Sequence, residues 1–156
     1  MCEFIFGQEK NVISRIGTHV YAKGADTAIT FYKDAFGLET KGEPWRDDNG
    51  LVISQNLHRK TGEVFMTICD YEHLPNEGFI NKYNTDNCLT MLFFVFFSGE
   101  DEMFRAVEVL SENAKLVREA ENKEPPVFCE IVDKFGVFWH LCVPDDKKII
   151  SDLDLI

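Results

Sequence analysis

The feature that most constrains the fold is an order of segments that occurs twice along the 156-residue chain. A segment with strand-like alternation is followed by an amphipathic helical segment, and two or three further strand-like segments come after that helix. Each occurrence spans about half of the chain, which is the pattern of an internal duplication. Because the helices are few and the strands follow one another, the pattern predicts an α+β fold rather than a doubly wound parallel sheet.

The first half of the chain contains a strand, a helix and a hairpin. Thr18, Val20 and Ala22 alternate with the residues between them, as in a strand. Apolar residues follow a helical spacing from Ala25 to Ala35, and Gly37 comes where a glycine often ends a helix. After a polar stretch that includes Trp45, two alternating segments, LVISQNLH and EVFMTICD, are separated by RKTG, which predicts a hairpin.

The second half repeats this order. It contains a strand in NCLTMLFFVFF, an amphipathic helix in GEDEMFRAVEVLSEN, and strands near KLVREAE, VFCEIVD and VFWHLCV. The longest apolar run, from Leu89 to Phe97, has the length of a buried strand and is much shorter than the ~20 residues of a membrane helix. The length of the chain predicts one domain. We expect its first module at residues 12–72, a loop at 73–87, a second module at 88–144 and a tail at 145–156.

The composition restricts the partners and the cellular location. With 16 Lys and Arg against 27 Asp and Glu, the formal charge is -11, which repels nucleic acid and anionic membranes. The N-terminal segment MCEFIFGQEK has an early acidic residue and does not resemble a secretory signal, so we expect a cytoplasmic protein. The five cysteines form no CxxC pattern, which predicts reduced thiols and no zinc knuckle.

Two segments resemble PhnB-like proteins of the vicinal-oxygen-chelate superfamily, which also includes glyoxalases, bleomycin-resistance proteins and dioxygenases. AITFYKDAFGLE is similar to the helix of that family, with Phe31-Tyr32 followed by Phe36-Gly37. DKFGVFWHL is similar to its closing turn and strand, with Lys134 in place of a proline. This resemblance implies two βαβββ modules that form a curled, mostly antiparallel sheet around a cavity, with the helices on the outside.

The resemblance also implies positions for a metal, because the enzymes of the superfamily bind one in the cavity. The usual ligands are a histidine, glutamine or glutamate early in each module and a glutamate late in each module. Gly17 occupies the first position, with His19 two residues further on the same strand face, and Leu92 offers no ligand in the second module. His140 takes the position of the last glutamate, and Asp70 lies near the end of the first module. The candidate metal ligands are therefore His140, His19 and Asp70, an incomplete set.

The same alignment suggests a ligand-binding cavity. Its expected lining residues are His19, Tyr21, Trp45, Phe138 and His140, with Trp45 in a loop that could cover the opening. Most of the 14 phenylalanines are expected in the core, but an aromatic-lined cavity would suit a flat or apolar small molecule. Cys142 shares a strand face with His140, which allows a thiol and base pair, although a buried cysteine usually acts as a small apolar residue.

Three functions remain open from the sequence. The first is a small-molecule-binding protein that lacks the full metal site and needs no cofactor. The second is a metal-dependent lyase, isomerase or dioxygenase that uses a divalent ion at an atypical His and Asp site. The third is a structural or regulatory dimer. The expected partners are a small-molecule ligand and a second copy of the chain, with no nucleic acid and no membrane.

Overall fold

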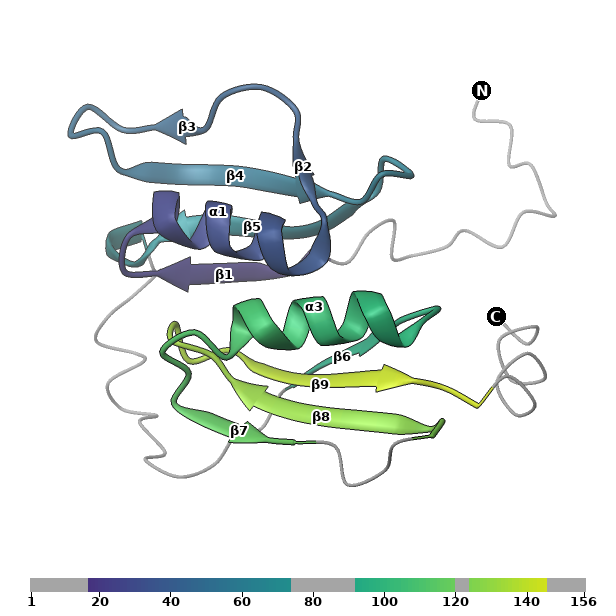
Figure 1. Ribbon diagram of the computed structural model, residues 1–156. Helices are drawn as coiled ribbons and strands as arrows, with labels where there is room; N and C mark the ends of the chain where they lie inside the picture. The colour runs from purple at the N-terminus through teal and green to yellow at the C-terminus, as the bar shows by residue number, and fades with distance from the viewer. Residues whose placement is uncertain (1–16, 74–91, 120–123, 146–156) are drawn as a thin grey trace, which may run out of the picture.

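The structure is a computed structural model that describes residues 17–73, 92–119 and 124–145. The first module comprises β1 (His19–Ala22), α1 (Ala25–Phe36), β2 (Glu39–Thr40), β3 (Trp45–Arg46), β4 (Val52–His58), β5 (Val64–Asp70) and a short 3₁₀ helix, η1 (Tyr71–His73). The second comprises β6 (Phe93–Phe96), α3 (Glu100–Leu110), β7 (Leu116–Arg118), β8 (Val127–Val132) and β9 (Phe138–Val143). This order confirms the predicted repeat of a strand, a helix and further strands (Figure 1).

The strands form two mixed sheets, so the fold is α+β as predicted. The first sheet has the order β1-β5-β4-β2 with β3 also paired to β4, and the second has the order β6-β9-β8-β7. In each module the first and last strands are parallel neighbours, and the remaining pairs are antiparallel. The sequence predicted one curled sheet, whereas the described strands pair within two separate sheets that have β1 and β6 at their edges.

The first helix begins where the sequence predicts and ends one residue later than predicted. It runs from Ala25 to Phe36, and its apolar stripe is buried. Gly37 follows in the left-handed conformation, with φ of 62°, and its N–H donates to the carbonyl of Lys33. A residue with a Cβ atom is strained at this φ, so the glycine provides a low-cost end to the helix.

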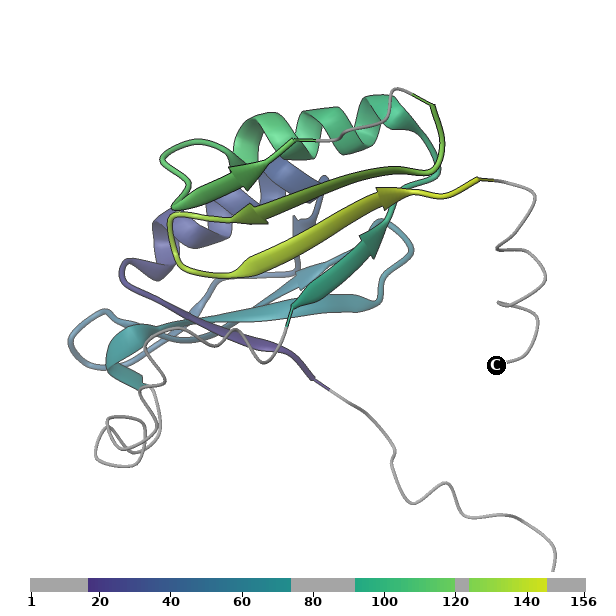
Figure 2. The same cartoon turned by 90° about the horizontal axis from the view of Figure 1, so that it is seen from below.

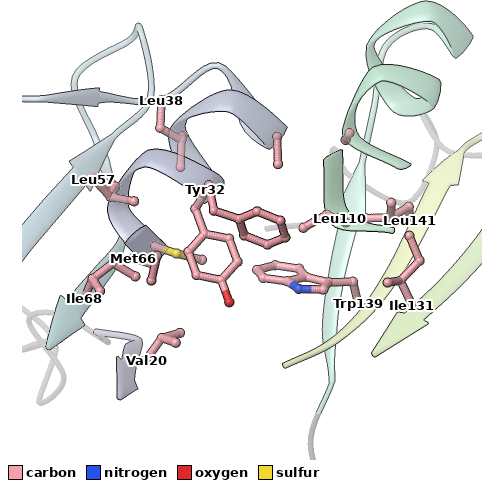
Figure 3. Close-up of a cluster of buried hydrophobic side chains, with 14 of the residues drawn as sticks. Val20, Tyr32, Leu38, Leu57, Met66, Ile68, Leu110, Ile131, Trp139 and Leu141 are labelled. Atoms are coloured by element: carbon pink, nitrogen blue, oxygen red, sulfur yellow. The ribbon is translucent and has the colours of Figure 1, made fainter. Parts of the chain in front are cut away.

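The two helices pack against each other, and each lies over one face of its own sheet (Figures 1 and 2). No helix of the described residues lies over the opposite face of either sheet. The helix-covered faces share one hydrophobic core, in which Tyr32 of α1 faces Trp139 of β9 (Figure 3). The ring centroids of these two residues are 5.7 Å apart. Fully buried aliphatic residues from both modules surround them, including Leu57, Met66, Ile68, Leu110, Ile131 and Leu141.

A buried carboxylate joins the two modules through this core. Asp133 is 0% exposed, and its Oδ2 accepts 2.8 Å hydrogen bonds from the Tyr32 hydroxyl and from Trp139 Nε1. Its Oδ1 accepts from the backbone N–H groups of Phe135 and Val137. A carboxylate in a core is stable only when such donors satisfy it. The aspartate of the DKFG turn therefore closes its own turn and also positions the helix of the other module.

One short strand differs from the sequence-based expectation. Trp45 was expected in a loop, but it lies in β3 and pairs with Ser54 of β4. The strand contains only two residues, which is too short for alternation to reveal it. The loop expected at residues 73–87 lies almost entirely outside the described residues. No helix within the described ranges is long and apolar enough to cross a membrane.

A candidate aromatic binding face

The uncovered face of the second sheet carries most of its exposed aromatic side chains. Strand alternation directs Trp139 and Leu141 of β9 toward the helices and directs His140, which lies between them, to the other side of the sheet. Phe94 of β6 and Glu130 of β8 lie directly beside His140 of β9 on that side. We call this surface the aromatic face, and it consists of Phe94, Phe96, Phe128, Phe138 and His140.

The rings of the aromatic face pack around the imidazole of His140. The Phe94 ring stacks on it with centroids 4.3 Å apart and an interplanar angle of 18°. The Phe128 ring meets it edge-on at 5.3 Å, and the Phe96 ring lies 4.6 Å from that of Phe94. Phe94, Phe96 and Phe128 are nevertheless 46%, 56% and 39% exposed. The face therefore offers preformed aromatic area to a ligand, without the cost of ordering long side chains.

A chain of polar side chains crosses three strands beneath these rings. Arg118 Nη1 of β7 lies 3.2 Å from Glu130 Oε2, and Glu130 Oε1 lies 3.2 Å from His140 Nδ1. A carboxylate only accepts hydrogen bonds, so His140 carries its proton on Nδ1 and presents a lone pair on Nε2 when it is neutral. His140 Nε2 is buried, and no described residue forms a hydrogen bond with it. The described residues therefore leave the acceptor capacity of this nitrogen unsatisfied.

The uncovered face of the first sheet is more polar. His19 and Tyr21 of β1 lie beside Thr67 and Cys69 of β5, on the face opposite Val20. His19 Nδ1 is 3.7 Å from Cys69 Sγ, and the His19 and Tyr21 ring centroids are 6.3 Å apart. Burial, and to a smaller extent the neighbouring Cys69, raises the pKa of Tyr21. This group offers an imidazole, a phenol and a thiol, all of them protonatable.

Asp70 lies on the helix-covered face of the first sheet, away from His19. It pairs with Ala22 and is 5% exposed. Its Oδ1 accepts from the backbone N–H of Ala25 at 2.9 Å, and its Oδ2 accepts from that of Val52 at 2.7 Å. Both carboxylate oxygens thus hold the start of α1 against β4.

The three residues that the sequence suggested as metal ligands do not form one cluster. His19 and His140 lie on different sheets, and Asp70 uses both carboxylate oxygens on backbone groups. Across the described residues there is no group of three or more His, Cys, Asp or Glu side chains placed to hold one ion. A catalytic zinc site needs three protein ligands and an open position, so these residues do not fit such a site within one chain.

The thiols of the two sheets are poor nucleophiles. Cys142 lies two residues from His140 on the same face, and burial raises its pKa. Burial raises the pKa of Cys69 as well, and the neighbouring Asp70 carboxylate adds to this effect. Since the thiolate is the reactive form, both residues are held in their unreactive state at neutral pH. Their environment resembles that of structural cysteines.

The structure brings the predicted cavity residues together in pairs. His19 and Tyr21 share the first sheet, and Phe138 and His140 share the second, whereas Trp45 lies on the edge strand β3 with 66% exposure. Sequence reasoning missed the neighbours of His140 on other strands, which are Phe94, Phe128 and Glu130. Alternation around Phe93 and Val95 could have placed Phe94 on the exposed face, but the pairing with His140 depends on strand order.

The architecture is that of the glyoxalase and vicinal-oxygen-chelate fold, as comparison with solved structures shows. A PhnB protein from Bacillus cereus superposes with a TM-score of 0.62 at 20% sequence identity, over 83% of this chain and 98% of that one. Neither the protein-family models nor the curated proteins match this sequence. At this level of identity the likeness establishes the fold alone.

Two further structures with the same fold bind different ligands. The fosfomycin resistance protein FosX from Listeria monocytogenes, solved as a mutant with Mn(II) and a phosphonic acid, has a TM-score of 0.57 at 12% identity, over 88% of this chain and 98% of its own. TnmS3, an antibiotic-binding protein from a Streptomyces species, has a TM-score of 0.53 at 14% identity, over 86% of this chain and 98% of its own. The fold therefore hosts both metal-containing and antibiotic-binding proteins, and the side chains must distinguish them.

Proposed function

We propose that the protein binds a flat, aromatic small molecule on the aromatic face and that it does so without a metal. The observation that carries this proposal is the packing of Phe94 and Phe128 around His140, with all three residues on one uncovered sheet face. Flat ligands gain stacking energy from such rings, and exposed phenylalanines lose unfavourable contact with water when a ligand covers them.

His140 gives the ligand its polar specificity. Glu130 orients the imidazole, so the bare Nε2 accepts a hydrogen bond from a ligand hydroxyl or N–H group. A buried acceptor that lacks a partner in the free protein gains most from such a donor. We therefore expect aromatic ligands with a phenolic or N–H donor to bind better than ligands of the same shape without one.

Binding of 2-naphthol tests the proposal, with 2-methoxynaphthalene as the matched compound that lacks the donor. Titration by fluorescence should show tighter binding of 2-naphthol, and His140→Ala should weaken it about tenfold, the worth of one hydrogen bond near 1.4 kcal/mol. Phe128→Ala should also weaken binding. Phe104→Ala is the control, because Phe104 is also an exposed phenylalanine but lies on α3, away from this face. Equal affinities of wild type and His140→Ala would contradict the proposal.

Metal analysis of the dialysed protein separates this function from a metal-dependent reaction. The binding proposal expects no stoichiometric zinc, nickel, iron or manganese. If about one ion per chain survives dialysis and is lost in His140→Ala, the protein is a metalloprotein and the proposal is wrong.

We assign the chain to the PhnB-like branch of the fold as part of the same proposal. The support is the pair of motifs at Phe31-Tyr32 and Phe36-Gly37, together with the 20% identity to the Bacillus cereus PhnB protein. A homodimer and a cytoplasmic location stay predictions from the sequence. A single domain is part of this proposal too, and the shared core supports it.

A further inference from the structure

A second site lies between the two modules, beside the ends of α1 and β6. It is a cleft of about 480 Å³, lined by residues 34–38, by residues 94–98 and by side chains from the β4–β5 hairpin and α3. Its volume falls within the range of protein binding sites for small molecules. Phe94 and Phe96 belong both to the cleft and to the aromatic face, but the other residues of the cleft do not.

The floor of the cleft is apolar and extends the shared core to the surface. The Phe36 ring lies 4.8 Å from the ring of the fully buried Trp139 and 5.3 Å from the Phe65 ring, measured between centroids. The Phe97 ring is stacked on that of Phe36 at 6.4 Å. Phe36, Phe65 and Phe97 are only partly buried. An apolar group of a ligand that covers them would therefore remove further aromatic surface from water.

Charged side chains of both signs line the same cleft. They are two guanidinium groups and two carboxylates, so the formal charge of the lining is zero, and they belong to Arg59, Arg105, Asp34 and Glu102. The first three are exposed, and no ion pair joins them to another side chain within the described ranges. Glu102 lies close to Gly99 at the start of its own helix, where the helix dipole stabilises a carboxylate.

This neutral lining restricts the charge of a ligand. An anion would be attracted by the arginines but repelled by the carboxylates, and a cation would be attracted by the carboxylates but repelled by the arginines. A zwitterion has a favourable partner for each of its charges. In an α-amino acid the ammonium, the carboxylate and the side chain all leave one carbon atom, so a single small molecule reaches the charged groups and the apolar floor at once.

We propose that the cleft binds a free α-amino acid with an aromatic side chain. The side chain lies on the apolar floor, the carboxylate pairs with a guanidinium group of the lining, and the ammonium pairs with Asp34. Guanidinium groups match the geometry of a carboxylate, and charge-assisted hydrogen bonds of this kind are stronger than neutral ones. This site goes beyond the small-molecule function of the aromatic face and does not depend on it.

L-Phenylalanine tests the site in the full-length, isotope-labelled protein by nuclear magnetic resonance titration. Its addition should shift the backbone amide signals of residues 94–98, which locates the site. Three analogues each lack one feature: 3-phenylpropanoate has no ammonium, 2-phenylethylamine has no carboxylate, and glycine has no apolar side chain. Each analogue should bind at least about tenfold more weakly than phenylalanine.

Variants of the charged residues test each pairing separately. Arg59→Gln with Arg105→Gln should weaken phenylalanine binding about tenfold and remove its advantage over 2-phenylethylamine. Asp34→Asn should remove the advantage of phenylalanine over 3-phenylpropanoate. Lys60→Gln and Asp101→Asn are the controls, because they remove charges of the same signs at exposed positions that do not line the cleft. Since all these positions are exposed, the variants should remain folded.

Three outcomes would overturn the amino-acid site. Equal affinities for phenylalanine and its two singly charged analogues would show that the cleft binds apolar groups whatever their charge. The absence of shifts at residues 94–98 with millimolar phenylalanine would also contradict the proposal, as would an unchanged affinity in the double arginine variant. That variant should still bind 2-naphthol, so this proposal and the aromatic-face proposal can fail separately.

Discussion

The Tyr32 hydroxyl lies 2.8 Å from Oδ2 of Asp133, a residue 101 positions later in the chain, and donates a hydrogen bond to it. This contact links α1 of the first module to the closing turn of the second. Burial, together with the adjacent Asp133 carboxylate, raises the pKa of Tyr32 far above its ordinary range. The phenol therefore stays protonated at neutral pH and donates to the Asp133 carboxylate.

Tyr32→Phe tests the contribution of this bond to stability. The substitution keeps the ring packing but removes one donor from the buried carboxylate of Asp133, so the free energy of unfolding should fall by about 1–3 kcal/mol. Urea denaturation measures the change. Tyr71→Phe is the control, because Tyr71 is 37% exposed and should change stability by less than about 0.5 kcal/mol. A loss no larger than that of the control would show that the bond contributes nothing.

Asp70→Asn should destabilise the fold by about 2–4 kcal/mol. One of the two backbone donors, from Ala25 or Val52, would then face an amide N–H instead of a carboxylate oxygen. Thermal or urea unfolding gives the size of the effect. Binding of 2-naphthol to the folded variant should be unchanged, because Asp70 lies on the helix-covered face of the other sheet. Loss of naphthol affinity without loss of stability would instead give Asp70 a role in binding.

The described thiols should react slowly in the native protein. Burial, followed by the Glu119 and Glu130 carboxylates, raises the pKa of Cys129 to about 11, so only about one thiol in a thousand is a thiolate at pH 8. A variant with Cys2→Ser and Cys88→Ser isolates the three described cysteines for titration with a disulfide reagent. We expect rapid reaction only after unfolding or above about pH 10. Fast labelling at pH 8 of one native thiol would contradict this.

The surface pair of Arg46 and Asp26 predicts a small pH effect. Arg46 donates two hydrogen bonds to the Asp26 carboxylate, at 2.6 and 3.0 Å, and these bonds lower the pKa of Asp26. A lowered folded-state pKa gives stability above the unfolded value, near 3.9, that is lost as the pH falls through the folded value. Asp26→Asn should therefore cost less than about 1 kcal/mol at pH 7, because the pair is exposed.

Comparison of unfolding curves at two pH values checks this prediction. The difference between wild type and Asp26→Asn should disappear in acid, once both proteins carry a neutral side chain at position 26. High salt should reduce the difference at pH 7, since exposed ion pairs are screened. If the difference in stability between wild type and Asp26→Asn instead increases in acid, the pKa of Asp26 is not lowered by folding and the prediction is wrong.

Local sequence patterns predicted much of the fold. The helix from Ala25 to Phe36 could be predicted because its apolar spacing and the closing Gly37 are properties of neighbouring residues. The hairpin of β4 and β5 followed from alternation on both sides of a short polar turn. The two-residue strand β3 could not be predicted, because too few residues are present to show a period.

The sequence by itself determined the α+β class and the repeated order of strands and helices, and it put His140 and Cys142 on one face of the same strand. Only the tertiary structure decided which side chains meet across the sheet. Glu130 lies beside His140 because β8 neighbours β9, and Asp70 turned to the helix side because α1 and β4 supply its donors. Periodicity depends on residues close in sequence, whereas such sites depend on strand order and register, which the packing of the whole core sets.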